Sequence, residues 1–356
     1  MYARTQAIFN FAPVETRSVK GLDYNLEVYR LISSRGKPTS ERGLPGVEGI
    51  FLGRTQEIST LMRLSHTFLR DKEGSIVVIE GEAGLGKSRL VKEWLQANDS
   101  THYRIWQGRG LPYAQGSGYG VFRSLVQDSI NKLPDSKKWS EQISDTFRPF
   151  IRNLLGVPTS AEDELTQRYL SPERTNQMYI LAIREWILNA AMENNLILVL
   201  DDFHWADDPS REVLKAVVKL IQTAPVLFVI ITRPTSGNTA FYDDITRFNP
   251  TKITIPPLNP EDSVKLLHNI ADLDNVPPEI IETILTRAEG NPFYIEEFIR
   301  MLIEKGVMTY ERNRWKVTAS LALERLDIPT SLRGMLMARI DRLPENLRYL
   351  LQDAAV

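Results

Sequence analysis

Eight consecutive residues carry the strongest motif in the sequence, Gly81-Glu82-Ala83-Gly84-Leu85-Gly86-Lys87-Ser88. It matches the phosphate-binding pattern G-x-x-x-x-G-K-[ST] at every fixed position. The short apolar, β-branched run Ser75–Glu80 precedes it, and apolar residues follow it at helical spacing, so we expect the loop to join a buried strand to a helix. Glycines let successive backbone N–H groups turn inward, and the N-terminus of the following helix adds partial positive charge. These eight residues are therefore predicted to form a phosphate-binding P-loop.

Two side chains of the loop have distinct predicted roles. Lys87 is expected to reach the β- and γ-phosphates of a nucleotide, and the Ser88 hydroxyl is expected to bind a magnesium ion. The alternative is a glycine-rich turn with an exposed lysine. The predicted strand and helix on either side count against that alternative, because they are the context in which a phosphate-binding loop occurs.

The composition limits the class of protein. With 356 residues, of which 42% are hydrophobic and 25% charged, the chain can form two or three domains and resembles ordinary soluble globular proteins. Its formal charge of −2 provides no bulk field that would attract DNA or an anionic membrane. No cysteine is present, which excludes disulfides and Cys-ligated zinc and is consistent with a cytoplasmic protein. No apolar run approaches the roughly 20 residues of a membrane span, and no signal peptide is visible.

Alternating strand-like and helical patterns begin at Phe51. This alternation predicts an α/β fold with a mainly parallel sheet sandwiched by helices. Roughly 90 residues separate the second strand from the third, more than a crossover needs, so we expect a helical insertion there. The predicted strands are Ile76–Glu80, Tyr103–Gln107, Leu196–Leu200, Val226–Ile231 and Ile253–Ile255.

After Pro256-Pro257 the strand patterns stop, and a small helical region is expected, followed by a hairpin and by helices from Ser331 and Pro344. Near the N-terminus, short strand-like pieces precede a polar, turn-rich segment over residues 33–43 that is typical of a linker. Both ends look cut, so we interpret the sequence as a piece of a longer polypeptide. The predicted ranges are helices Pro260–Ala271, Pro278–Glu289 and Pro292–Lys305, hairpin strands Val307–Tyr310 and Trp315–Val317, and N-terminal strands Ile8–Phe11, Arg17–Lys20 and Leu26–Leu31.

Paired aspartates follow the apolar strand predicted over Leu196–Leu200. We expect this strand to lie next to the P-loop strand, with Asp201 at its C-terminal edge, where ligands bind in open α/β sheets. Asp201 is predicted to hold magnesium directly or through water, and Asp202 to orient or deprotonate an attacking water. The alternative is a solvated strand end, which the upstream P-loop disfavours.

Two further candidates follow later elements. The strand Val226–Ile231 ends at Thr232-Arg233-Pro234, where a fixed guanidinium could sense the γ-phosphate or simply face solvent before a turn. From the residues alone, Gly290-Asn291-Pro292 is only a helix stop followed by a helix start.

These motifs, in this order, resemble the STAND class of P-loop NTPases, which are signal-transduction ATPases of the AAA-related lineage. Phe51–Glu57 is similar to the hhGRExE signature of that class, with Thr55 in place of its first acidic residue. Leu200–Asp207 resembles its DD-hydrophobic-HWAD form. Ile231–Pro234 and Glu289–Phe293 resemble its sensor strand and the G-x-P motif of its helical lid. The resemblance covers residues 50 to about 305.

The resemblance implies further roles and a domain order. Gly53 and Arg54 would lie near the adenine and ribose, Arg233 would contact the γ-phosphate, and Pro292 would pack against the base and couple the lid to nucleotide state. The implied domains are an NTPase domain at 49–257, a lid at 258–306 and the start of a winged helix at 307–356. The predicted ATP-binding residues are Gly53, Arg54, Gly81, Glu82, Ala83, Gly84, Leu85, Gly86, Lys87, Ser88 and Pro292; the predicted catalytic residues are Lys87, Asp202 and Arg233; the predicted Mg²⁺ ligands are Ser88 and Asp201.

Residues 1–32 have a resemblance of their own, carried by Tyr2–Gln6, Phe9–Phe11, Val19–Leu22 and Val28–Leu31. They are similar to the last strands of a class III nucleotide cyclase domain, followed here by a linker at 33–48. By that analogy Lys20 would contact a substrate triphosphate. The paired metal-binding aspartates of a cyclase do not precede it, so we expect the parent protein, and not this chain alone, to couple a cyclase to the ATPase.

The leading hypothesis is an ATP-dependent regulatory switch with slow hydrolysis or none. Its expected partners are ATP or ADP, the cyclase and the C-terminal sensor regions of the parent polypeptide, and a homo-oligomer is left open. A second hypothesis makes cyclic nucleotide synthesis by the parent the main activity, with this region as scaffold. A third is a nucleic-acid-binding ATPase of the replication-initiator or transcription-activator type. Its local support is Arg333, Arg339 and Arg342, and the near-neutral charge counts against it.

Overall fold

The computed structural model describes most of the chain from residue 51 to residue 317 and four short strands before it. The described ranges are 9–11, 15–17, 26–28, 31–34, 51–98, 102–112, 118–133, 136–158, 169–234, 239–272, 276–305, 307–311 and 314–317, with isolated positions between 334 and 351. The chain forms two compact units, Met1–Gly49 and Ile50–Val356. Each unit is described by itself.

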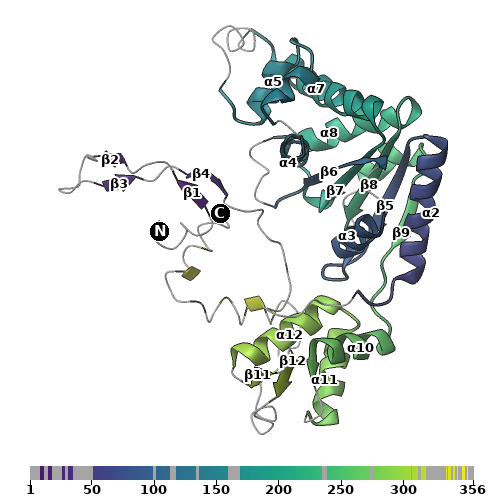
Figure 1. Cartoon of the computed structure of the whole chain (residues 1–356), viewed down its shortest axis with the longest axis vertical. Coiled ribbons are helices and arrows are strands. Elements are labelled where there is room, and N and C mark those ends of the chain that lie inside the picture. The colour runs from purple at the N-terminus through teal and green to yellow at the C-terminus, as the bar shows by residue number, and fades with distance from the viewer. Residues whose placement is uncertain are drawn as a thin grey trace. The chain divides into compact units, whose positions relative to one another are not determined.

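A five-stranded sheet is the centre of the larger unit (Figure 1). Its strands lie in the order β6-β7-β8-β5-β9, and every neighbouring pair is parallel. The predicted α/β fold with a mainly parallel sheet is therefore confirmed. All five predicted strands are present, as β5 (Ser75–Glu80), β6 (Arg104–Arg109), β7 (Leu196–Asp201), β8 (Val226–Thr232) and β9 (Thr251–Thr254).

The predicted neighbour of the P-loop strand is wrong. The strand that pairs with β5 on its inner side is β8, and β7 lies one position farther away. Both β7 and β8 are apolar runs, so their hydrophobicity alone does not distinguish the central position. β8 is buried at all seven of its residues, as a strand covered on both faces requires. The consequence is that the end of β8 lies between the P-loop and the paired aspartates.

Two apolar cores cover the two faces of the sheet. Val77 and Ile79 pack with α2 (Thr55–Asp71) and α3 (Lys87–Ala97), whereas Ile76 and Val78 belong to the opposite core. This alternation follows from the two-residue repeat of a strand. The opposite core is formed with helices α4 (Gly120–Asn131), α5 (Arg148–Leu154), α7 (Pro172–Glu193) and α8 (Asp208–Val217). Three of these, α4, α5 and α7, lie with η2 (Ser136–Gln142) between the second and third strands, where a helical insertion was predicted.

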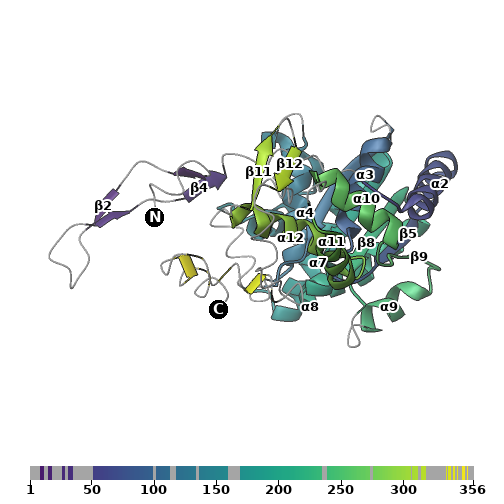
Figure 2. The same cartoon turned by 90° about the horizontal axis from the view of Figure 1, so that it is seen from below.

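Helices α10 (Pro260–Ile270), α11 (Pro278–Ala288) and α12 (Pro292–Glu304) follow the sheet, as predicted. The side chains of Asn259 and Asn291 cap α10 and α12, and a proline occupies the first turn of each of the three helices. β11 (Met308–Glu311) and β12 (Arg314–Val317) form the predicted hairpin, which Figure 2 shows beside α12. The short strand β10 (Ala271–Asp272), which was not predicted, pairs in parallel with β12.

The smaller unit contains two antiparallel pairs. β1 (Phe9–Phe11) pairs with β4 (Leu31–Ser34), and β2 (Glu15–Arg17) pairs with β3 (Leu26–Val28). The strand predicted over Leu26–Leu31 is thus two strands, and the strand predicted over Arg17–Lys20 overlaps β2 only at Arg17. Hydrophobic alternation is weak in this polar stretch, so the strand boundaries depend on which strands pair and cannot be read from the local pattern. The following predicted features lie outside the described residues: Lys20, the arginines Arg333, Arg339 and Arg342, and the helix starts at Ser331 and Pro344.

Within the described ranges, no helix is long and apolar enough to cross a membrane.

Candidate functional site: a P-loop between the sheet edge and the helical lid

The P-loop connects β5 to α3, as the sequence predicts. Gly84 and Gly86 have φ values of 85° and 89°, which only glycine adopts readily, and Gly86 is the N-cap of α3. The buried Lys87 folds back along the loop, and its Nζ donates to Gly81 O at 2.7 Å and to Glu82 O at 2.8 Å. An ammonium group has three donors, so one remains for a phosphate oxygen. Burial and then the charge of Arg233 lower the pKa of Lys87.

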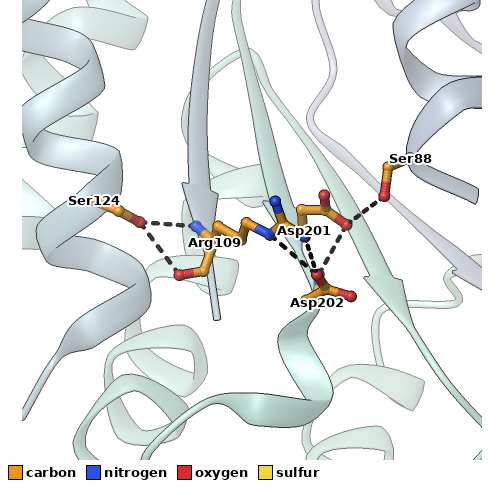
Figure 3. A network of polar contacts seen from close by, with 5 residues as sticks. All are labelled: Ser88, Arg109, Ser124, Asp201 and Asp202. Atoms are coloured by element: carbon orange, nitrogen blue, oxygen red, sulfur yellow. Dashed lines mark hydrogen bonds and ion pairs between the residues drawn. The ribbon is translucent and has the colours of Figure 1, made fainter. Parts of the chain in front are cut away.

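Ser88 and Asp201 face each other at the carboxyl edge of the sheet (Figure 3). Ser88 Oγ donates a hydrogen bond of 2.9 Å to Asp201 Oδ1, across the position of β8. Burial and then the neighbouring Asp202 charge raise the pKa of Asp201. A hydroxyl and a carboxylate oxygen beside a phosphate-binding loop fit Mg²⁺, which uses one or two protein oxygens together with phosphates and water. No cluster of three or more His, Asp or Glu ligands occurs in the described part of the chain.

Asp202 is held by an arginine that the sequence did not single out. Arg109, the last residue of β6, donates from Nε and Nη2 to Asp202 Oδ2 at 3.0 and 2.8 Å (Figure 3). The Arg109 backbone is fixed by a 2.8 Å bond from its N–H to Ser124 Oγ of α4. Asp202 has a positive φ of 51°, and a Cβ atom on Gly110 would lie 2.4 Å from Asp202 O. The end of β6 thus sets both the backbone and the side chain of Asp202.

Arg233 follows β8 and lies between the P-loop and the aspartates. Its charge lowers the pKa of both Lys87 and His204, and β8 is paired with both the P-loop strand β5 and the aspartate strand β7. The structure therefore brings together the three residues predicted to be catalytic, Lys87, Asp202 and Arg233, with the two predicted metal ligands.

Gly53 and Arg54 lie where α2, the P-loop and α10 meet; α10 is the first of the three helices α10, α11 and α12, which are called the lid below. Both have a left-handed backbone, with φ of 67° and 63°. The Arg54 side chain is only 6% exposed, and its Nη2 donates to Leu85 O at 3.4 Å. Burial lowers the pKa of Arg54, against the charges of Glu57 and Asp262. A Cβ on Gly53 would lie 2.9 Å from Asp262 Oδ2 of α10, so this junction admits no larger residue at position 53 without movement.

The lid contacts the P-loop through Asn291, one residue before the predicted Pro292. Asn291 Nδ2 donates to Ala83 O at 2.9 Å, while its Oδ1 accepts from the N–H groups of Phe293 and Tyr294 at 3.1 and 3.4 Å. A Cβ on Gly84 would lie 2.6 Å from Asn291 Oδ1. The residue triplet that sequence patterns describe only as a helix boundary therefore joins the first turn of α12 to the phosphate-binding loop.

Comparison with known proteins relates residues 50–230 of the larger unit to ATPases. A family model described as AAA ATPase domain matches residues 50–230, which are 181 of the 356 residues. An uncharacterised protein of Rhizobium meliloti (strain 1021) is 24% identical over 302 residues, covering 79% of this chain and 28% of that protein. Adenylate cyclase type 10 of Oryctolagus cuniculus is 20% identical over 276 residues, covering 73% of this chain and 17% of that protein. The chain thus spans less than a third of the length of these curated relatives.

A solved structure has a similar fold. The structure of the Aeropyrum pernix Orc1 protein in complex with DNA aligns with a TM-score of 0.51 and 14% identity, covering 85% of this chain and 72% of that one. At this identity the likeness concerns the fold alone.

Proposed function

The chain belongs to the AAA ATPase domain family, and from that membership we propose that it is an ATP-binding switch of the STAND type with slow hydrolysis. The observation that carries the proposal is the position of the P-loop. Asp201 at the sheet edge accepts a hydrogen bond from Ser88 of the loop, and Asn291 of the lid is bonded to the Ala83 carbonyl of the loop. A ligand that fixes the conformation of this loop can therefore change the preferred positions of both the sheet-edge residues and the lid.

The phosphate contacts in this proposal come from the loop N–H groups, Lys87 and Arg233. Ser88 and Asp201 would hold Mg²⁺, which neutralises charge on the phosphate oxygens when bound. Gly53 and Arg54 would border the nucleoside, with Pro292 on the lid side. All of these roles are compatible with the positions described above.

Asp202 is the residue proposed to position the attacking water. Arg109 occupies its Oδ2, and Oδ1 has no hydrogen bond from the described residues, so Oδ1 is the atom that can accept from a water. The arginine restricts the carboxylate to one orientation. We attribute the expected slow hydrolysis to this restraint, because it limits how far the Asp202 carboxylate can move with the attacking water.

The switching step follows from differential affinity. ATP would hold the P-loop, Lys87 and Arg233 in one arrangement, and loss of the γ-phosphate would remove the contacts that favour it. Because Asn291 is bonded to the loop, the preferred position of α12 would change with the loop. An effector in the same polypeptide could respond to that change.

Nucleotide titration of the wild type, Lys87→Ala and Lys92→Ala by calorimetry tests the proposal. Lys92 lies on the exposed side of the same helix, so its replacement controls for the loss of a lysine on α3. We expect wild type and Lys92→Ala to bind Mg·ATP alike. Lys87→Ala should bind about tenfold or more weakly, since one lost charged contact is worth about 1.5–3 kcal/mol. Equal affinity in Lys87→Ala and the wild type would contradict the assignment.

The similarity to adenylate cyclase type 10 favours a class III cyclase as the effector. We propose that the full-length protein couples this ATPase region to such a cyclase, of which residues 1–32 would be the last part. Cyclic nucleotide production by the full-length protein should then change when Lys87 is replaced by Ala. An unchanged rate of cyclic nucleotide production at all ATP concentrations would show that the ATPase region does not control the cyclase.

A further inference from the structure

Glu80 is a buried acidic residue directly before the P-loop, and the proposed site gives it no role. It is the last residue of β5 and is 8% exposed. A buried carboxylate costs free energy unless it is paired with a cation and hydrogen-bonded. At the root of a loop that binds phosphates it also adds negative charge next to an anionic ligand. The groups that hold Glu80 therefore matter for ligand binding as well as for the fold.

Two residues from later elements hold the Glu80 carboxylate. The Tyr242 hydroxyl of α9 (Thr239–Thr246) donates to Oε1 at 2.7 Å, and Lys252 Nζ of β9 lies 2.6 Å from Oε2. Burial would raise the pKa of Glu80, but the hydrogen bonds from Lys252 and Tyr242 lower it below its ordinary value. The carboxyl group is thus ionised, and each of its oxygens has a protein partner.

The sheet explains why these three residues meet. β9 pairs in parallel with β5, and Lys252 lies opposite Val78, two residues before Glu80 and on the same face of the sheet. Helix α9 covers this face, since Ile245 is buried in the core that contains Val78 and Tyr242 packs against that core. The consecutive elements α9 and β9 are therefore joined to the root of the P-loop through one carboxylate.

The backbone at this root is held by the end of the same strand. Ile255 N–H, directly after β9, donates to Glu80 O at 2.7 Å. A Cβ atom on Gly81 would lie 2.9 Å from Ile255 O, so Gly81 fits closely against the chain that follows β9. Gly81 O in turn accepts from Lys87 Nζ at 2.7 Å. A displacement of Glu80 would therefore also displace an acceptor of the P-loop lysine.

We propose that Lys252 is a positioning residue for nucleotide binding, which balances the charge of Glu80 and so keeps the root of the P-loop in its phosphate-binding geometry. Removal of one partner from a buried ion pair leaves an uncompensated charge, which is strongly unfavourable. Without Lys252, the carboxylate could reach solvent only by displacing Gly81 and with it the contact to Lys87. If it stayed in place, its charge would oppose the phosphates. The proposal rests on the proposed function, because it assigns a residue to the support of the same nucleotide site.

Calorimetric titration with Mg²⁺ and the non-hydrolysable analogue AMP-PNP tests the proposal in the wild type, Lys252→Met and the double variant Lys252→Met/Glu80→Gln. Met keeps most of the length of the lysine side chain without its charge, and Gln keeps the shape of Glu80 and an acceptor for Tyr242. We expect Lys252→Met to bind about fivefold or more weakly than the wild type. The double variant should recover to within about twofold of the wild type, because a neutral amide needs no ammonium partner.

The recovery is the readout that a merely structural lysine would not give, because the double variant lacks the ammonium as well. The control is Lys219→Met, a change at an exposed lysine of η4 (Val218–Gln222). This short helix lies beside the start of β5, at the end away from the P-loop, where a Cβ on Gly74 would meet the backbone of Ile221. Lys219→Met should bind AMP-PNP like the wild type.

The outcomes separate this proposal from the one it rests on. An unchanged affinity in Lys252→Met would show that the charge of Glu80 needs no balance, and a loss that Glu80→Gln does not restore would show that Lys252 acts only through the fold. Either result overturns the role of Lys252 and leaves nucleotide binding by the wild type intact. Failure of the wild type to bind AMP-PNP would instead overturn the proposed function, and this proposal with it. Lys252→Gln provides the same comparison if Met disturbs folding.

Discussion

The sheet edge and the lid contact the same P-loop through different kinds of group. At the sheet edge the groups are charged side chains on elements that the core holds in place: Asp201, which accepts a hydrogen bond from Ser88 of the loop, and Arg233 directly after β8. From the lid, the amide of Asn291 and the backbone around Gly290 meet peptide groups of the loop and of residues 257–258. The edge can therefore respond to the charge of a ligand, whereas the lid responds through Asn291 to the conformation of the loop.

We expect the largest effect from a substitution that removes a charge at the sheet edge. Asp201→Asn removes the carboxylate that faces Ser88 while keeping its size, so the benefit of Mg²⁺ to ATP binding should fall by about tenfold or more. Titrations with Mg²⁺ and with EDTA measure that benefit in the wild type and in the variant. Asp208→Asn, at an exposed aspartate of α8, is the control. An unaltered Mg²⁺ effect in Asp201→Asn would remove Asp201 from the metal site.

A smaller effect is expected for two glycine substitutions in the loop, which together distinguish backbone strain from contact with the lid. Gly84→Ala and Gly86→Ala both place a side chain at positive φ, which costs about 1–2 kcal/mol each. Only the new Cβ at position 84 meets the lid, 2.6 Å from Asn291 Oδ1, whereas position 86 has no atom within 4 Å. Gly84→Ala should therefore lower the free energy of unfolding by about 1 kcal/mol more than Gly86→Ala. Denaturant unfolding measures both, and equal losses would mean that the lid does not press on the loop.

We expect the smallest effect from substitutions of Asn291, which alter only the contact between the lid and the loop. Asn291→Asp keeps the acceptor that caps α12 but loses the donor to Ala83 O, whereas Asn291→Ala loses both. Asn291→Ala should be less stable than Asn291→Asp by about 1 kcal/mol, the usual value of a helix N-cap. Both variants should expose the lid to protease more readily than the wild type does. Wild-type protection in Asn291→Asp would show that the bond to Ala83 is dispensable.

Much of the fold could be predicted because its signals are local. The buried runs of β5, β7 and β8 and the lid helices that start with proline follow from hydrophobic patterns and capping residues, and the helical insertion follows from the length of chain between two strands. Strand order could not be predicted in the same way, since β7 and β8 are equally apolar and only packing decides which one lies beside β5.

The residues of the site also differ in whether local sequence patterns indicate them. Lys87, Ser88 and Asp201 could be found because a motif fixes their spacing or their place at a strand end. Arg109 and Asn291 lie 93 and 208 residues from the groups they contact, and no pattern near them indicates these partners. A charged residue at the end of a strand on the ligand edge, the feature that pointed to Arg233, is the one signal that could have found Arg109.

Hydrogen exchange of the Phe293 and Tyr294 amides, measured without nucleotide, with Mg·ADP and with Mg·AMP-PNP, tests most directly whether the loop transmits nucleotide state to the lid. These amides are capped by Asn291, whose other end is bonded to the P-loop. We expect these amides to exchange more slowly with AMP-PNP than with ADP. Saturated nucleotide binding with identical exchange in both complexes would contradict it.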